Sequence, residues 1–148
     1  MINFLKTIEN LKMANNNGYI PLHIACRNKR VTLEILNNLT NEETKNMKNF
    51  NNYNALHLLA LNESLNAEIL KPFSSLENIN SKNKNGETPL HVACRNKKIS
   101  FEIVKLLKSK ESFKTLNNAG KTPLQISCTN KSISQELFAY LITEENNI

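Results

Sequence analysis

The side chains of this sequence that could do chemistry recur at a fixed interval. Three histidines are separated from one another by 34 residues, at His23, His57 and His91. The three cysteines share a second register of the same interval, at Cys26, Cys94 and Cys128. Histidine and cysteine bind transition metals, and a cysteine thiolate can act as a nucleophile. Two hypotheses follow, a metal site and a catalytic site.

A carboxylate recurs at the same interval, at Glu34, Glu68, Glu102 and Glu136. Paired carboxylates can act as general acid and base. Each glutamate, however, stands two positions after a residue type that begins helices, at Thr32, Asn66, Ser100 and Ser134. There its charge meets the positive end of the helix dipole. One structural role explains all four, so we predict no catalysis by these groups.

Other catalytic patterns are missing from the sequence. It contains no glycine-rich phosphate loop, no dinucleotide fingerprint and no nucleophile with an adjacent base. We therefore expect a protein that is not an enzyme and that has no catalytic residues, no cofactor and no bound metal.

The interval of 34 residues organises the whole chain. A leucine recurs at Leu22, Leu56, Leu90 and Leu124, and an asparagine recurs at Asn28, Asn62, Asn96 and Asn130. No insertion or deletion interrupts the register. Such a period indicates a solenoid, in which one supersecondary unit stacks on its own copies.

Each copy predicts two short helices. The first begins at Thr88 and Pro89 in the third copy, with threonine as N-cap and proline at the first helical position. Small apolar residues such as Ala93 and Cys94 lie on one face of it, so it should pack closely as an inner helix. The second helix carries larger apolar residues such as Ile103 and forms an outer layer. Polar segments join the copies, and glycines permit tight turns there, at Gly18, Gly86 and Gly120.

Stacking would separate the chemical side chains. Equivalent residues of adjacent copies should lie about 10 Å apart, which is the spacing of packed helices. Zinc ligands must lie within about 2.3 Å of one ion, and a disulfide needs Cα atoms within about 7 Å of each other. We therefore predict that all three cysteines are reduced core residues.

The third copy reads Gly86-Glu87-Thr88-Pro89-Leu90-His91-Val92-Ala93, which resembles the Gly-x-Thr-Pro-Leu-His-x-Ala signature of ankyrin repeats. This resemblance implies an all-α solenoid of stacked helix-turn-helix units with short hairpin loops between repeats. It also implies that each histidine in the first turn of an inner helix hydrogen-bonds loop backbone of its own or a neighbouring repeat.

We divide the chain into a truncated N-terminal capping helix and four repeats, at residues 1–15, 16–49, 50–83 (degenerate), 84–117 and 118–148 (the C-terminal cap). The period exceeds the family's usual length of about 33 by one residue. The extra residue falls beside Asn28 and its equivalents, where asparagine in the left-handed conformation is expected to end the inner helix.

Net charge and hydropathy restrict the classes of partner and the cellular location that we expect. The net charge of +6 suits an acidic partner, but the lysines are scattered, which argues against nucleic acid. No apolar stretch approaches the roughly 18 residues of a membrane span, and no secretory signal is visible. We expect a soluble monomer in the cytoplasm, with the nucleus as the alternative.

Repeat stacks bind partners with their hairpin tips and inner helices, which form an extended concave surface. Specificity should lie where the repeats differ: the tip, the residue after the turn glycine and the end of the inner helix. These positions predict partner contacts at Asn17, Tyr19, Arg27, Phe50, Tyr53, Lys84, Glu87, Arg95 and Lys121. Aromatic and arginine side chains often anchor interfaces, so Tyr19, Arg27, Phe50 and Tyr53 form the expected hot spot. Alternatively, Phe50 and Tyr53 cover the imperfect core of the second repeat.

The features together predict a protein-interaction module, an adaptor or scaffold, whose partner is another protein with an acidic surface. The basic residues on the predicted face favour that charge, at Arg27, Lys84, Arg95 and Lys121. The alternative is a targeting segment of a longer enzyme, such as a kinase or ubiquitin ligase, whose catalytic domain lies outside these residues.

The second repeat is predicted to be the weakest. Asn54 and Ala55 replace the Thr-Pro helix start, and Leu59 replaces a small residue. Pro72 lies six positions after the N-cap Asn66, where it costs about 3 kcal/mol unless the helix kinks or ends. We expect a shortened or bent outer helix.

Hydrogen exchange tests this expectation. Amides of residues 66–76 should exchange faster than those of residues 100–110, because a weak repeat opens locally at lower free energy. Equal protection of the two segments would show that the second repeat is no weaker than the third.

Overall fold

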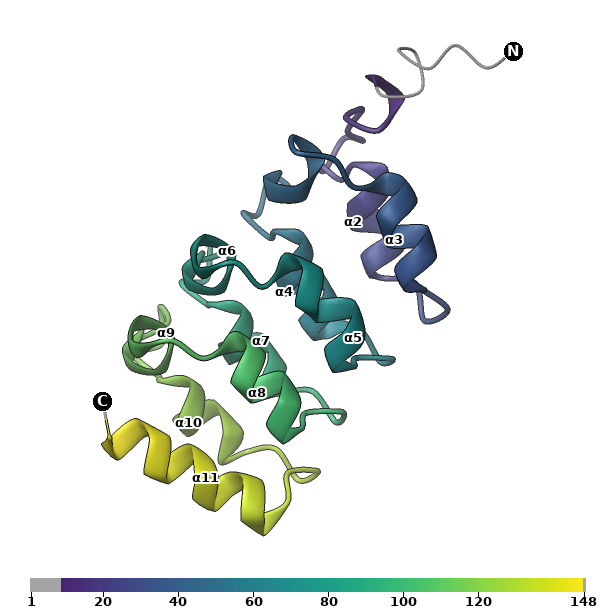
Figure 1. Ribbon diagram of the computed structural model, residues 1–148. Helices are drawn as coiled ribbons and strands as arrows, with labels where there is room; N and C mark the ends of the chain where they lie inside the picture. Colours follow the sequence, from purple (N-terminus) through teal and green to yellow (C-terminus); the bar gives the residue numbers. More distant parts are fainter. Residues whose placement is uncertain (1–8, 148) are drawn as a thin grey trace.

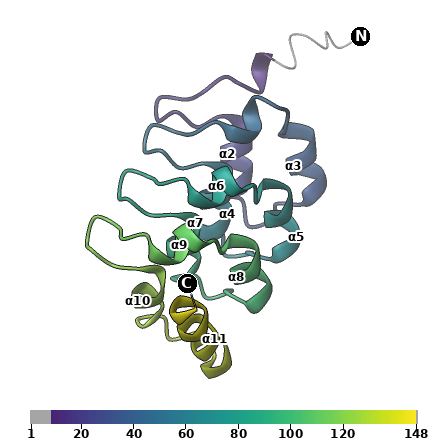
Figure 2. The ribbon, with the colours of Figure 1, turned by 60° about the vertical axis from the view of Figure 1, so that its left-hand side comes forward.

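The computed structural model describes residues 9–147, which fold into layers of paired helices (Figure 1). The inner column consists of α2 (Pro21–Cys26), α4 (Ala55–Leu61), α7 (Pro89–Ala93) and α10 (Pro123–Ser127). The outer column consists of α3 (Leu33–Leu39), α5 (Ala67–Leu70), α8 (Phe101–Leu107) and α11 (Gln135–Asn146). Hairpin loops project side by side from the inner column (Figure 2). Residues 9–147 contain no β-strand, so the predicted all-α solenoid is confirmed.

The predicted N-terminal capping helix lies mostly outside the described residues, because its residues 1–8 are not described; residue 148 of the last repeat is not described either. At the start of the described range, the backbone N–H of Lys12 donates to the carbonyl of Glu9 at 3.1 Å. Glu9 and Asn10 are helical, and a turn at Leu11 and Lys12 then leads into the first loop.

A third short helix, which the sequence pattern did not predict, follows the outer helix in the first three layers. These helices are η1 (Thr44–Asn46), α6 (Leu76–Asn80) and α9 (Lys110–Lys114). A buried polar side chain holds each of them to the end of the outer segment. The side chains of Thr44, Asn78 and Ser112, all in one register, donate at 3.1 Å to the carbonyls of Leu39, Phe73 and Leu107. The chain therefore reverses at an equivalent place in each layer.

The predicted outer N-caps are confirmed, since the side chains of Thr32, Asn66, Ser100 and Ser134 each accept a helix N–H. In the second repeat, Asn54 accepts the N–H of His57 at 2.9 Å. Leu59 is fully buried. The prediction that this repeat loses its helix start was therefore wrong, because asparagine caps as well as threonine does.

The outer helix of the second repeat is shortened as predicted. Helix α5 has four residues, whereas α3 and α8 have seven each. A 3-10 turn, η2 (Lys71–Phe73), follows it and contains Pro72. The missing proline N–H ends the α-helical hydrogen bonding there.

The core runs continuously through the stack, with Leu22, Leu56 and Leu90 fully buried in register. All three cysteines are free, and burial raises the pKa of the Cys26 and Cys94 thiols to about 12. These two thiols stay protonated and act as small core groups. Cys128 is exposed, which corrects the prediction for this residue. It is the C-cap residue of the last inner helix, at the end of the described stack.

Asparagines after the inner helices tie each repeat to the one before it. The Nδ2 group of Asn62 donates to the carbonyl oxygens of Cys26 and Asn28, at 2.7 and 2.9 Å. Asn96 and Asn130 make the equivalent pairs of bonds in the next two repeats, over 2.7 to 3.1 Å. Each amide thus satisfies carbonyls that the preceding inner helix leaves open at its end.

This asparagine ladder corrects the expectation that these residues end the helices in a left-handed conformation. Asn62 has φ −68° and ψ 134°, which is extended backbone. Among residues 9–147, the non-glycine residue with positive φ is Asn52. The asparagines recur because their side chains bond across repeats.

His57 and His91 also bridge adjacent layers, whereas His23 bonds the end of its own repeat; both kinds of bond are among those that the family resemblance implied. Nε2 of His57 donates to the carbonyl of Glu87 at 2.8 Å, while Nδ1 accepts the N–H of Asn54 at 3.3 Å. Nε2 of His91 and of His23 lies 2.9 and 3.0 Å from the loop carbonyls of Lys121 and Met47. Each ring therefore caps its own helix and holds a loop.

Gln125 occupies the histidine position in the last repeat. Its Oε1 accepts the N–H of Thr122 at 3.0 Å, which reproduces the capping bond. Its side chain is exposed and makes no bond to a further loop within the described residues. Glutamine therefore keeps the capping bond of histidine. The second bond of histidine, to a loop carbonyl, has no counterpart at Gln125 in the described part of the chain.

The asparagine ladder predicts a position-dependent loss of stability. Asn96→Ala should lower the free energy of unfolding by about 2–4 kcal/mol, because two carbonyls and the N–H of Lys98 lose their partner. Asn28 is exposed, and within residues 9–147 its side chain bonds only the N–H of Arg30 in its own turn, so Asn28→Ala should cost less than about 1 kcal/mol. Urea unfolding of both variants measures the difference, and equal losses would contradict the ladder.

The histidines predict that acid weakens the stack. Burial lowers the pKa of His57 from 6.5 to about 4, and burial also lowers the pKa of His23 and of His91. Between these values the unfolded chain binds a proton that folded His57 does not bind. The contribution of neutral His57 to the free energy of unfolding is therefore complete above pH 6.5 and is lost as pH falls to about 4.

Urea unfolding at a series of pH values should show a loss on the order of 3 kcal/mol over this window from His57. The variant His57→Gln, which copies Gln125, should be less stable at neutral pH and should depend less on pH than the wild type does. An unchanged pH dependence in this variant would rule out the assignment to His57.

Candidate functional site

A single residue type shapes every hairpin loop. In each loop the Oδ1 atom of one asparagine accepts the backbone N–H groups two and four positions later, at Asn15, Asn49, Asn83 and Asn117. The predicted turn glycines have positive φ, and Asn52 takes the same conformation in the second repeat, with φ 62°. The four tips are therefore built alike.

The tips are joined into one row, which Figure 2 shows in side view. The N–H of Phe50 donates to the carbonyl of Asn17 at 3.1 Å, and the N–H of Lys84 donates to the carbonyl of Asn51 at 3.0 Å. A Cβ atom at Gly18 would lie 2.6 Å from Cδ1 of Phe50, so only glycine allows this approach. The row presents the tip side chains at a fixed spacing.

Two positions on the face formed by loops and inner helices interact in a repeating way: the residue after the tip and the residue eight positions later. In the first repeat, the guanidinium of Arg27 lies 5.3 Å from the centroid of the Tyr19 ring. In the third repeat, Arg95 forms a bidentate ion pair with Glu87, at 2.6 and 2.9 Å. One register position thus holds a cation–π contact in one repeat and an ion pair in another.

Most of the predicted contact residues lie on this face or at the tips. Six of them are exposed, namely Asn17, Arg27, Phe50, Lys84, Arg95 and Lys121. Tyr19 and Tyr53 are half-buried, with ring centroids 6.1 and 5.6 Å from those of the buried rings of His23 and His57. Phe50 is 61% exposed, so it does not cover the core of the second repeat, whereas Tyr53 packs against that core.

Glu87 differs from the expectation for a contact residue, because it is only 6% exposed. The hydrogen bond from Arg95 holds the pKa of its carboxyl group below the ordinary value. The charge of Glu87 is used within the protein, and its role is to position Arg95.

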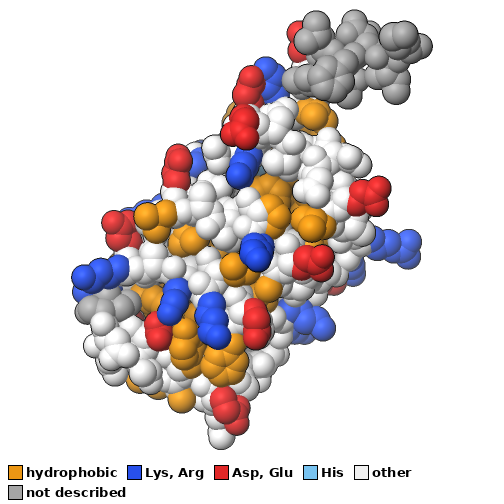
Figure 3. All heavy atoms as spheres, viewed as in Figure 1, with side chains coloured by type: hydrophobic (Ala, Val, Ile, Leu, Met, Phe, Trp, Pro, Cys, Tyr) orange, Lys and Arg blue, Asp and Glu red, His pale blue; other side chains and the backbone are white. Residues whose placement is uncertain are grey.

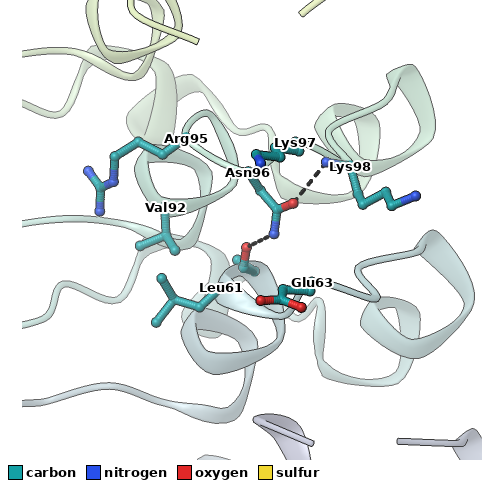
Figure 4. Close-up of a pocket in the computed structure, with 8 residues that line it drawn as sticks. Leu61, Glu63, Val92, Arg95, Asn96, Lys97 and Lys98 are labelled. Carbon is teal, nitrogen blue, oxygen red and sulfur yellow. Dashed lines mark hydrogen bonds between the residues drawn. The ribbon is translucent and has the colours of Figure 1, made fainter. Parts of the chain in front are cut away.

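A groove crosses the ends of the inner helices, and we call it the inner groove. Its larger pocket, of about 530 Å³, lies between the second and third repeats (Figure 4) and is lined by Ala60, Leu61, Glu63, Val92, Arg95, Asn96, Lys97 and Lys98. A smaller pocket, of about 280 Å³, lies one repeat earlier and is lined by Arg27, Lys29, Leu58, Leu61, Asn62 and Glu63. Both are lined by Leu61 and Glu63, so the pockets are neighbours.

The larger pocket has apolar and charged parts. Leu61 and Val92 approach each other on one side of it, while Asn96 is held by the carbonyl of Ala60 and the N–H of Lys98 (Figure 4). Leu61 is 49% exposed, a high value for a leucine beside a pocket. The groove therefore contains an apolar side chain that is open to contact by a partner.

Cations outnumber anions along the inner groove. Five basic side chains line the two pockets against one carboxylate, at Arg27, Lys29, Arg95, Lys97, Lys98 and Glu63. Glu63 pairs with Lys29 at 3.0 Å. Sequence reasoning found the two arginines but missed these lysines, although they follow the recurring asparagines directly.

The face of the outer helices has a different character. Figure 3 shows small separate groups of hydrophobic side chains there, with positive and negative side chains interspersed. Residues 9–147 include no helix that is long and apolar enough to cross a membrane. The same range contains no group of three His, Cys, Asp or Glu side chains that could hold a metal ion.

Comparison with known proteins agrees with the repeat architecture. A family model described as ankyrin repeats, in three copies, matches residues 56–148. A search of curated proteins found no match. The matched range contains α7 and α10 and all of α4 except Ala55. The chain belongs to the ankyrin-repeat family.

Proposed function

We propose that this protein is an adaptor or scaffold that binds a segment of a partner protein along the inner groove and the row of tips. Ankyrin repeats are generally protein-protein interaction modules. The observation that carries the proposal for this chain is the groove itself, where exposed Leu61 lies between two pockets rimmed by basic side chains.

The anchors beside this groove are held in place before a partner arrives. Tyr19 and Tyr53 pack on buried histidine rings, Arg27 stacks on Tyr19, and Glu87 fixes Arg95. Side chains that are already ordered lose less conformational entropy on binding. Tyrosine and arginine are also the residue types that most often dominate interface energies.

Charge favours an acidic partner segment. The basic side chains of the groove are joined by Lys84 and Lys121 at the tips, and the chain has a net charge of +6. Attraction between exposed charges is screened over about 8 Å at physiological salt. The affinity should therefore fall as the salt concentration rises.

Affinity capture from the source cell followed by binding measurements with the purified partner tests the proposal. The double variant Tyr19→Ala/Tyr53→Ala should bind at least about tenfold more weakly, because two anchor side chains are lost. Leu76→Ala, which removes an exposed side chain on α6, serves as the matched control and should bind like the wild type.

Two results would contradict this function. The first is a partner whose affinity is unchanged by the tyrosine substitutions. The second is an affinity that stays constant from low to high salt, which would exclude the acidic partner segment.

A further inference from the structure

The two pockets of the inner groove are equivalent in register but differ in chemistry. A shift of 34 residues places Arg27 of the smaller pocket on Leu61 of the larger one, and Leu58 on Val92. The same shift places Leu61 of the smaller pocket on Arg95 of the larger one. Both pockets therefore hold an arginine and share Leu61, and they differ in how the arginine is paired.

Arg27 and Arg95 occupy one register position and differ in their pairing. Arg95 is neutralised by Glu87 through two hydrogen bonds. Arg27 stacks on the neutral ring of Tyr19, and within residues 9–147 it forms no ion pair with an acidic side chain. The smaller pocket thus offers an arginine able to bind a carboxylate, while the larger pocket, whose arginine is already paired, offers the exposed apolar surface of Leu61.

The spacing of the pockets restricts the partner further. They lie one repeat apart, which is about 10 Å for packed helices. A polyproline II segment has three residues per turn and rises about 3.1 Å per residue, so residues three positions apart lie on one side and about 9 Å apart. A β-strand would place residues three positions apart on opposite sides. The pockets share Leu61 and Glu63 in their lining and are therefore neighbours, which suits a single extended segment.

Building on the proposed function, we infer that the inner groove recognises an extended acidic segment in which a carboxylate side chain and an aliphatic side chain stand three positions apart. The carboxylate binds Arg27, and the aliphatic side chain enters the larger pocket and packs against the exposed side chain of Leu61. Arg27 and Leu61 therefore determine specificity, and the tyrosines contribute contact area.

Labelled synthetic peptides test the spacing, with binding followed by anisotropy and by NMR shifts of residues 58–63 and 92–98. A peptide with the core Glu-Pro-Pro-Leu should bind about tenfold more tightly than Glu-Pro-Leu, Lys-Pro-Pro-Leu or Glu-Pro-Pro-Ser in the same Gly-Ser flanks. Equal binding of all four, or shifts outside the groove, would overturn the inference. So would an absence of binding, or tighter binding of a helical peptide with the two side chains seven positions apart.

Exchanging the charges of Arg27 and of the peptide gives a test that misfolding cannot imitate, because a misfolded variant would not gain affinity for a new peptide. Arg27→Glu should lose affinity for Glu-Pro-Pro-Leu and gain affinity for Lys-Pro-Pro-Leu, each by about tenfold. Leu61→Lys should remove the preference for leucine over serine. Lys105→Glu on α8 makes the same charge change on the outer face and should leave every affinity unchanged. Failure of the exchange would overturn the assignment of Arg27.

The outcomes separate this inference from the proposed function. If the captured partner still requires Tyr19 and Tyr53 while the peptides show no preference for spacing, only the segment chemistry is wrong. If the captured partner is indifferent to both tyrosines, the proposed function fails, whatever the peptides show.

Discussion

The fold depends on satisfying backbone groups across repeat boundaries. An inner helix of five to seven residues leaves most of its terminal N–H and C=O groups without helical partners. The amide of Asn62 or Asn96 serves the carbonyl end of the preceding helix, and the ring of His57 serves its own N-terminal end and the next loop. Short helices are stable here only as members of the stack.

The same constraint creates the candidate binding surface. Because equivalent bonds recur from one layer to the next, side chains that take no part in them fall into rows along the inner face. Tyr19 and Glu87 share one row, and Arg27, Leu61 and Arg95 share another. The asparagines and histidines that bond across repeats set the spacing of the rows. The residue types that vary along each row set the charge and polarity of the groove. The groove can therefore change its specificity without any change in the fold.

The sequence predicted what local chemistry and period determine. The four layers, the caps of the outer helices, the turn glycines and the shortening of α5 at Pro72 follow from residue types at fixed positions. The third helices were missed because their organising residues, Thr44, Asn78 and Ser112, share a register but no common type. The cross-repeat amide bonds were missed because Asn62 suits a helix end locally, while its actual partners are 34 and 36 residues away. Burial of Glu87 depended on its pairing with Arg95, which no local pattern reveals.

Hydrogen exchange of the protein with and without its purified partner tests the central claim most directly, namely that stacking builds a partner-binding groove on the inner face. The account predicts added protection in residues 58–63 and 92–98, which line the groove, and unchanged exchange in the outer helix α8, Phe101–Leu107. Protection confined to the outer helices, with the groove segments unchanged, would contradict it.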